Sequence, residues 1–194
     1  MVNQEYVEND KIKAILKYIK GMKHSEMIRM MFFCSMNGLR CVNFRCLQVR
    51  DCVDQTGTIK DVIELPELKN KGKFGAKYYV NNQFKAELET YYRYMKEKYG
   101  ENLNEDTYLF VSQKTRKPFN RVSICRLFHN IYETFGIKGA SHLGRHQFIT
   151  KIANAGVSVF VCRLLANHKN ISTTQKYFNS TKPQLLTAVE NARI

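Results

Sequence analysis

Apolar side chains recur at intervals of three and four residues in several separate stretches of the sequence. In residues 11–20 this recurrence puts Ile12, Ile15 and Ile19 on one face of a helix, with lysines on the other. Such spacing is typical of an amphipathic α-helix that packs its apolar face against a core. The same pattern, together with helix-start and helix-stop residues, predicts further helices. They cover residues 25–37, 40–47, 83–99, 120–136, 141–156 and 158–165, with short ones starting at Thr173 and Pro183.

Two short stretches are predicted to be β-strands instead. Residues 58–65 and 76–81 flank a basic loop at residues 69–73, and Pro66 marks an edge position or a strand end. The sequence contains no internal repeat, low-complexity segment or flexible linker. We therefore expect an α+β fold that is mainly α-helical, with a small antiparallel β-sheet on one side, as a single domain over residues 1–194.

The chain is strongly basic: 31 Lys and Arg residues against 17 Asp and Glu residues give a formal net charge of +14. A hydrophobic fraction of 44% is enough to form a core, which excludes a disordered basic tail. No run of 18 apolar residues occurs and the N-terminus lacks a signal-peptide pattern, so we expect neither a transmembrane span nor secretion. The charge indicates a polyanionic partner, most simply a nucleic acid. On charge alone, a basic protein without catalytic chemistry is an equally good interpretation.

The six cysteines do not form a metal-binding or disulfide pattern, because none belongs to a Cys-x-x-Cys pair. Several lie in or beside apolar helical stretches, so buried free thiols are expected. We therefore expect no metal site, a reducing compartment and a soluble intracellular protein.

Four residues in the last third of the sequence stand at informative distances from one another. His142 and Arg145 are 3 residues apart, so they share a face of one predicted helix. His168 follows His142 by 26 residues and Tyr177 follows it by 35. Arg40 lies far upstream, directly after a helix-ending glycine segment. Four specified residue types at fixed spacings arise by chance in only about one chain in several thousand.

These residues and their neighbours resemble the tyrosine recombinase (phage integrase) family over residues 40–178, most of the chain. The segment Gly38-Leu-Arg40 resembles the family's first arginine box, and His142-Leu-Gly-Arg145-His146 resembles its His-x-x-Arg-His box. Leu165-Ala-Asn-His168 and Thr173-Thr-Gln-Lys-Tyr177 resemble its last two segments, and the spacings are those that the family uses.

The resemblance implies a recombinase that cleaves and religates DNA without a cofactor or a metal. Tyr177 would be the nucleophile, because a tyrosine hydroxyl can retain the cleaved phosphate as a covalent 3′-phosphotyrosine. Arg40, Arg145 and His168 would hold the phosphate oxygens, where negative charge gathers in the transition state. His142 would assist the removal of the tyrosine proton.

The family also implies a lysine on the β-hairpin that gives a proton to the leaving 5′ oxygen. Lys71 is preferred because it precedes Gly72, and Lys69 and Lys73 are its rivals. A solvated basic hairpin without a catalytic lysine is the alternative interpretation. Other basic residues are expected to follow the DNA backbone. They include Lys114, Arg116, Lys117, Arg121 and Lys138.

Three departures from the family's pattern are visible. Asn43 stands where an acidic residue often follows the first arginine, and Asn167 stands where a glycine is usual. Neither change removes a proposed chemical group. Only 39 residues precede Arg40, so the family's N-terminal core-binding domain is expected to be absent. The chain would be a minimal recombinase, similar to the fimbrial phase-variation invertases, or the catalytic fragment of a longer integrase.

The family implies double-stranded DNA as the partner, a homo-tetramer on paired recombination sites and accessory DNA-bending proteins. It implies a bacterial or phage-encoded cytoplasmic protein that joins the nucleoid when bound to DNA. The tail over residues 182–194 is expected to dock on a neighbouring protomer through Leu185, Leu186 and Val189, with an intramolecular helix as the alternative. Integration, excision and inversion are all open. Two other functions stay open as well: a non-catalytic sequence-specific DNA-binding protein on this scaffold, and a type IB topoisomerase-like enzyme.

Overall fold

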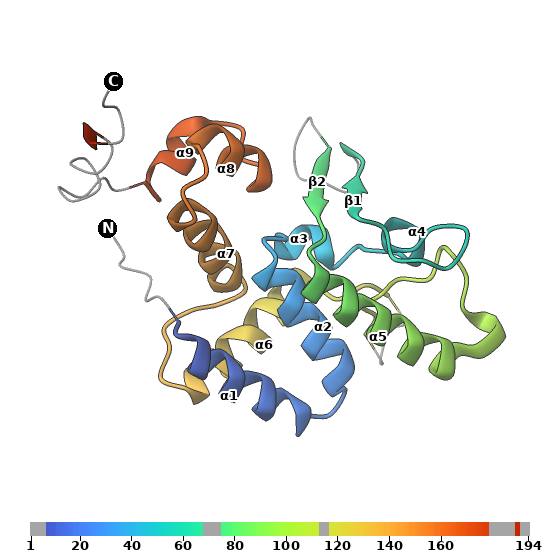
Figure 1. The fold of residues 1–194 in the computed structure, drawn as a ribbon. Coiled ribbons are helices and arrows are strands. Elements are labelled where there is room, and N and C mark those ends of the chain that lie inside the picture. The colour runs from blue at the N-terminus through green and yellow to red at the C-terminus, as the bar shows by residue number, and fades with distance from the viewer. Residues whose placement is uncertain (1–6, 68–74, 113–116, 179–188, 191–194) are drawn as a thin grey trace. The chain divides into compact units, whose positions relative to one another are not determined.

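The structure, a computed structural model, describes residues 7–67, 75–112, 117–178 and 189–190 (Figure 1). The chain divides into two compact units, Met1–Phe148 and Ile149–Ile194. The single domain expected over residues 1–194 stays a prediction. Across the described ranges, no helix combines the length and the apolar character needed to cross a membrane.

Helix α2 (Ser25–Met36) runs through the first unit between α1 (Asn9–Lys20) and α5 (Asn82–Tyr99) (Figure 1). Eight of its 12 residues are buried, because a helix that is apolar nearly all round is stable only in an interior. α1 buries one apolar stripe, as an amphipathic helix does. These helices confirm the predictions over residues 11–20, 25–37 and 83–99.

The predicted caps fix where two helices of this unit begin. The side-chain oxygen of Asn81 accepts the N–H of Phe84 at 2.8 Å and starts α5. Asn120 accepts the N–H of Val122 at 2.8 Å and starts α6 (Arg121–Thr134). Each cap satisfies an N–H group that has no partner inside its helix. The helix predicted from Asn120 is confirmed.

Aromatic rings from several elements form the centre of the first unit's core. Phe32 of α2 stacks on Phe128 of α6 with ring centroids 6.2 Å apart. Phe44 of α3 (Cys41–Phe44) meets Phe110 edge-on at 6.0 Å, and Phe110 stacks on Tyr91 of α5 at 5.8 Å. Each such pair contributes about 0.5–1.5 kcal/mol beyond the area it buries. The rings therefore hold α2, α3, α5 and α6 in fixed positions.

The helix predicted over residues 40–47 is shorter than expected. α3 ends at Phe44, and the carbonyl of Leu47 then accepts the N–H of Leu109 at 2.9 Å. Backbone pairing with this distant segment overrides the local helical pattern. A one-turn helix, α4 (Val49–Cys52), follows where the sequence pattern predicts none.

Strands β1 (Val62–Leu65) and β2 (Ala76–Tyr79) form an antiparallel pair, with Leu65 opposite Ala76. One face of the pair is buried, and the other carries an exposed ion pair between Glu64 and Lys77 at 2.7 Å. Pro66 directly follows β1, which confirms the predicted strand end. The described residues thus confirm a mainly helical fold with a small antiparallel sheet.

The second unit contains the end of α7 (Leu143–Asn154), α8 (Val159–Leu165) and α9 (Ile171–Gln175). The Ser158 hydroxyl accepts the N–H of Val161 at 3.3 Å, so α8 begins where the sequence predicts. The helix predicted from Pro183 lies outside the described residues, as do Leu185 and Leu186 of the tail. Val189 is described and exposed.

The cysteines behave as small apolar side chains more than as reactive groups. Burial raises the pKa of the Cys41 thiol to about 11, so this thiol stays protonated and is a poor nucleophile or metal ligand at neutral pH. All six are free thiols: Cys34, Cys41, Cys52 and Cys162 are buried, and Cys46 and Cys125 are partly exposed.

Candidate active site

Arg40 stands on the sharp turn that joins α2 to α3. The turn depends on Gly38, whose φ of +83° lies in the left-handed region that side chains rarely adopt. The backbone carbonyl of Arg40 accepts the N–H groups of Asn43 and Phe44, so Arg40 is the residue that caps α3. Its side chain is half-buried. The turn therefore fixes the backbone from which this guanidinium projects.

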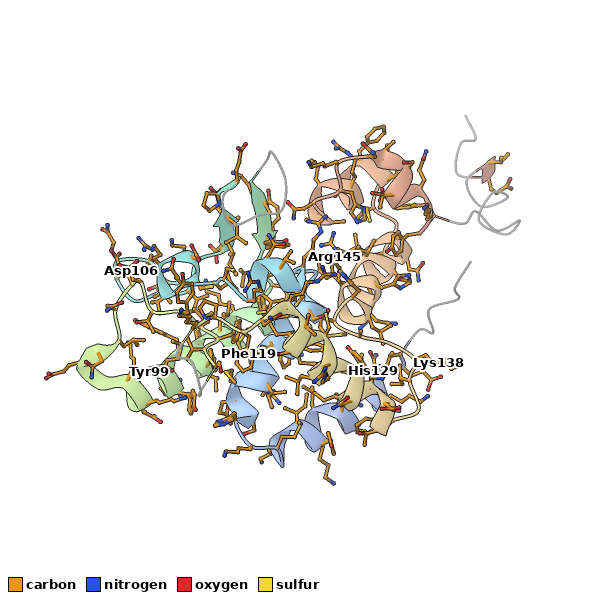
Figure 2. The ribbon with its side chains drawn as sticks, turned by 180° about the vertical axis from the view of Figure 1, so that it is seen from behind. Tyr99, Asp106, Phe119, His129, Lys138 and Arg145 are labelled. Carbon is orange, nitrogen blue, oxygen red and sulfur yellow. The ribbon has the colours of Figure 1, made fainter. Side chains whose placement is uncertain are left out.

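Arg145 lies in the first turn of α7 (Figure 2), and it is 6% exposed. Its guanidinium donates a hydrogen bond to the carbonyl oxygen of Gly38. One helical turn further on, the Phe148 ring packs so closely on Gly38 that an added Cβ would lie 2.5 Å from it. The two predicted arginine boxes, 105 residues apart in sequence from Arg40 to Arg145, are thus brought together.

A second set of contacts joins the same two segments. The Ser35 hydroxyl of α2 donates to the carbonyl oxygen of Ser141 at 2.9 Å. Gly144 lies against Ser35, where an added Cβ would be 2.5 Å from the hydroxyl oxygen. The Ser141 hydroxyl itself lies 3.2 Å from the thiol of Cys125 on α6. The residue that precedes His142 is therefore held from two helices.

His142 lies just before α7, which begins at Leu143, one residue later than a helix capped by Ser141 would begin. The carbonyl of His142 accepts the N–H of His146 at 2.9 Å, so His142 caps the helix. Partial desolvation of its ring lowers the pKa of His142, and the positive charges of Arg121, Arg145 and Arg40 lower it further. The imidazole therefore stays neutral, and able to accept a proton, at a lower pH than an ordinary histidine.

Arg121 is the residue of this cluster that the sequence pattern did not single out. From the sequence it is expected only to follow the DNA backbone, yet its positive charge also lowers the pKa of His142. Arg121 stands at the first position of α6, directly after the Asn120 cap. That position is predictable from the sequence, but its nearness to a residue of another helix is not.

Replacing Arg121 with glutamine is expected to raise the pKa of His142 toward the ordinary histidine value. The substitution removes a positive charge that disfavours the imidazolium, so the ring will take up a proton at a higher pH. An NMR titration of His142 in the free protein measures this shift. Arg126→Gln, which removes an exposed charge from the same helix, is the matched control. A pKa of His142 that moves equally in both variants would contradict the local effect of Arg121.

His168 and Tyr177 lie together in the second unit. Their rings face each other with centroids 6.5 Å apart and planes inclined by 27°. The Nδ1 atom of His168 is 2.9 Å from the hydroxyl oxygen of Thr174. The N–H of Tyr177 donates to the carbonyl of Thr174 at 3.0 Å. Both predicted site residues of this unit thus contact the same residue, Thr174: His168 contacts its side chain and Tyr177 contacts its backbone.

Asn167, which replaces the glycine usual in the family, adopts a φ of +48°. This left-handed conformation explains the glycine of the family, because glycine reaches it without strain and asparagine is among the few other residues that tolerate it. His168 directly follows, and its N–H donates to the carbonyl of Arg163 at 3.0 Å. The turn at Asn167 therefore sets the position of His168.

Changing Asn167 to valine is expected to destabilise the protein by about 1–2 kcal/mol, because a β-branched residue is strained at this φ. Asn167→Gly is expected to stay within about 0.5 kcal/mol of the wild type. Urea denaturation measures both changes. Asn170→Val, at a φ of −104°, carries no such strain and serves as the control. A valine variant as stable as the glycine variant would rule out backbone strain at this turn.

The structure brings Arg40, His142 and Arg145 together in the first unit, and His168 and Tyr177 together in the second. Lys71 and its rivals Lys69 and Lys73 lie outside the described residues, so the general acid stays a prediction. Asn43 is fully buried in α3, where an amide costs less to bury than the carboxylate often found there in the family.

Comparison with known sequences gives the family. The sequence model of the phage integrase family matches residues 5–184. The tyrosine recombinase XerA of Pyrococcus furiosus is 30% identical over 93 residues, which are 47% of this chain and 32% of that protein. XerA of Pyrococcus horikoshii is 32% identical over 90 residues, 45% of this chain and 31% of that protein. The matches thus span about a third of the length of these relatives.

Solved structures share the fold. The integrase of transposon Tn1549, in complex with transposon right end DNA, matches with a TM-score of 0.72 at 19% identity, over 99% of this chain and 67% of that one. XerA recombinase matches with a TM-score of 0.71 at 20% identity, over 98% of this chain and 65% of that one. XerH, bound to its difH substrate, matches with a TM-score of 0.71 at 17% identity, over 95% of this chain and 53% of that one.

The mainly helical fold with its two-stranded antiparallel pair is that of the tyrosine recombinase catalytic domains. The family match includes Arg40, His142, Arg145, His168 and Tyr177. Because this match covers residues 5–184 of the 194, it is not confined to one motif or one unit of the chain. The chain belongs to the phage integrase family of tyrosine recombinases.

Proposed function

We propose that this chain is a site-specific DNA recombinase that cleaves and rejoins DNA strands through a covalent 3′-phosphotyrosyl intermediate. Tyr177 is the nucleophile. Arg40, Arg145 and His168 bind the non-bridging oxygens of the scissile phosphate, on which negative charge increases in the transition state. The recombination product is an integration, an excision or an inversion, according to how the two DNA sites are arranged.

The strand cleavage in this proposal exchanges one phosphoester bond for another and moves two protons. The Tyr177 hydroxyl oxygen attacks phosphorus, and the bond between phosphorus and the 5′ oxygen breaks. His142 accepts the tyrosine proton, and Lys71 gives a proton to the leaving 5′ oxygen. Because the phosphodiester energy is kept in the phosphotyrosine, a 5′ hydroxyl of another strand can reverse the step without a nucleotide cofactor.

The observation that carries this proposal is the pairing of Tyr177 with His168. The chain has 11 tyrosines, and Tyr177 is the one that the family's nucleophile segment specifies. Its ring faces the imidazole of His168 at 6.5 Å, and both residues are attached to α9 through Thr174. Covalent strand cleavage needs a nucleophile and a group that binds the phosphate, and Tyr177 and His168 supply these two roles in the proposal.

The positive charges around His142 support an anionic substrate. Arg40, Arg145 and Arg121 all act on this imidazole, and such a cluster repels itself unless an anion is bound. A DNA phosphate supplies that anion, and arginine can grip it with two parallel hydrogen bonds. The net charge of +14 extends the attraction beyond the site.

The partner in this proposal is double-stranded DNA, bound by four copies of the chain on two paired sites. The Tn1549 integrase and XerH were solved on DNA, which supports the substrate class. Assembly through the tail at residues 182–194 and help from DNA-bending proteins belong to the same proposal. Binding is expected to weaken steeply as the salt concentration rises, because phosphate contacts release counterions.

A nicked suicide substrate tests the function. Cleavage beside the nick releases a short oligonucleotide that diffuses away, so the phosphotyrosyl complex cannot be resealed and accumulates. A denaturing gel is expected to show a protein–DNA adduct with the wild type and none with Tyr177→Phe. The phenylalanine variant keeps the ring and loses only the hydroxyl, so its DNA affinity should be unchanged.

The alternatives give different outcomes in the same assay. A non-catalytic DNA-binding protein would shift the DNA in a native gel and form no adduct with any substrate. A type IB topoisomerase-like enzyme would form the adduct on unrelated sequences and relax supercoiled plasmids without a preferred site. An adduct that depends on one DNA sequence supports the recombinase.

A further inference from the structure

Thr174 is a buried polar residue placed between the two site residues of the second unit. Its side chain is fully buried, with an exposed fraction of 0%. The hydroxyl oxygen lies 2.9 Å from Nδ1 of His168, and the backbone carbonyl accepts the N–H of Tyr177 at 3.0 Å. One residue thus contacts His168 with its side chain and Tyr177 with its backbone.

Burial makes this hydrogen bond costly to lose. A hydroxyl group removed from water without a partner destabilises a protein, so the contact with His168 is held firmly. The adjacent Thr173 is exposed, although it has the same side chain. The short helix α9 therefore directs one threonine of this pair toward the site and the other toward solvent.

The hydrogen bond has a chemical consequence for His168. A neutral imidazole carries its proton on one nitrogen, and the partner of the other nitrogen decides which. A hydroxyl that donates to Nδ1 puts the proton on Nε2. An Nε2–H group is a hydrogen-bond donor, which is what a phosphate oxygen requires.

We propose that Thr174 is a positioning residue of the recombinase site: its hydroxyl donates to Nδ1 of His168 and holds the imidazole as the Nε2–H tautomer that faces the scissile phosphate. This proposal rests on the proposed function, because the phosphate decides which tautomer of His168 is useful, but the tautomer itself can be measured in the free protein without DNA. Because its side chain is fully buried, Thr174 is not expected to touch DNA. It acts through His168, and its carbonyl fixes the backbone of Tyr177 at the same time.

Three variants separate the hydroxyl from the shape of the side chain. Thr174→Val keeps the shape and removes the hydroxyl, whereas Thr174→Ser keeps the hydroxyl and removes a methyl group. Thr173→Val makes the same change at the exposed neighbour and is the matched control. Circular dichroism and a thermal unfolding curve verify that each variant is folded under the assay conditions.

The first measurement uses the free protein. Nitrogen-15 NMR of the His168 ring distinguishes a protonated from an unprotonated nitrogen. We expect the Nε2–H tautomer to dominate in the wild type, in Thr174→Ser and in Thr173→Val, and a mixture of tautomers in Thr174→Val. An unchanged ring spectrum in Thr174→Val would overturn the proposal.

The second measurement is the single-turnover cleavage rate on the suicide substrate. Thr174→Val is expected to cleave about 10-fold more slowly, with unchanged DNA affinity. A rate loss of this size corresponds to the free energy of one lost hydrogen bond. Thr174→Ser should restore most of the rate. A serine variant as slow as the valine variant, or an equal loss in Thr173→Val, would overturn the positioning role.

The two measurements also separate this proposal from the function on which it rests. If the wild type forms no adduct with DNA, the proposed function fails, and the NMR comparison still decides whether Thr174 sets the tautomer of His168. If the adduct forms and the tautomer does not respond to Thr174→Val, the recombinase stands and the role of Thr174 is wrong.

Discussion

Replacing Arg145 with lysine is expected to lower the rate of strand cleavage by about 100- to 1000-fold, the loss typical when one donor to a transition-state oxyanion is removed. The guanidinium of Arg145 is nearly buried and donates to the carbonyl of Gly38, so its planar group is held in one orientation before DNA binds. A lysine keeps the charge but has a single ammonium group and cannot bind two phosphate oxygens in parallel. The single-turnover rate on the suicide substrate measures the effect.

Two controls show whether the lower cleavage rate of Arg145→Lys comes from a slower cleavage step or from a smaller fraction of folded protein. Arg126→Lys makes the same change at an exposed position of α6 and is expected to cleave at the wild-type rate. Thermal unfolding of Arg145→Lys reports how much of the protein is folded at the assay temperature. A rate loss no larger than the loss of folded protein would assign Arg145 to structure alone.

The change of Gly38 to alanine is expected to destabilise the protein by about 2–5 kcal/mol. Two costs add at this position. The φ of +83° strains any residue with a Cβ by about 1–2 kcal/mol. The added Cβ would also meet the Phe148 ring at 2.5 Å, and overpacking of this kind costs about 1–3 kcal/mol. Urea denaturation measures the sum.

Gly57 offers a matched control, because it has a φ of +85° and no atom within 4 Å of an added Cβ. Gly57→Ala therefore carries the backbone strain alone and is expected to cost about 1–2 kcal/mol. The difference in the free energy of unfolding between the two variants measures how tightly Phe148 packs against Gly38. Equal costs would mean that Phe148 moves aside freely and does not clamp the turn before Arg40.

Much of this fold follows from the sequence, because helix signals are local. The caps at Asn120 and Ser158 and the apolar spacing of residues 11–20 each depend on neighbours within a few positions. The errors come from contacts that are not local. The helix predicted over residues 40–47 ends at Phe44 because Leu47 pairs with Leu109, and no local pattern reports that pairing.

The residues of the candidate site also divide into those that the sequence pattern predicts and those that depend on non-local contacts. Arg40, His142, Arg145, His168 and Tyr177 were predicted because their spacing is that of a family. Arg121 and Thr174 were not, because each acts through a contact that its own neighbours do not reveal. The sequence shows two adjacent threonines, and only the structure tells which of them is buried against His168.

In the proposed reaction, the Tyr177 hydroxyl forms a covalent bond with DNA. The most direct measurement is to digest the adduct from the suicide substrate with trypsin and nuclease and to identify the modified residue by mass spectrometry. Cleavage after Lys169 or Lys176 leaves Tyr177 as the one tyrosine of its peptide. The expected result is a 3′-nucleotide phosphate on this peptide. A modification on any other residue, or an adduct that persists in Tyr177→Phe, would contradict it.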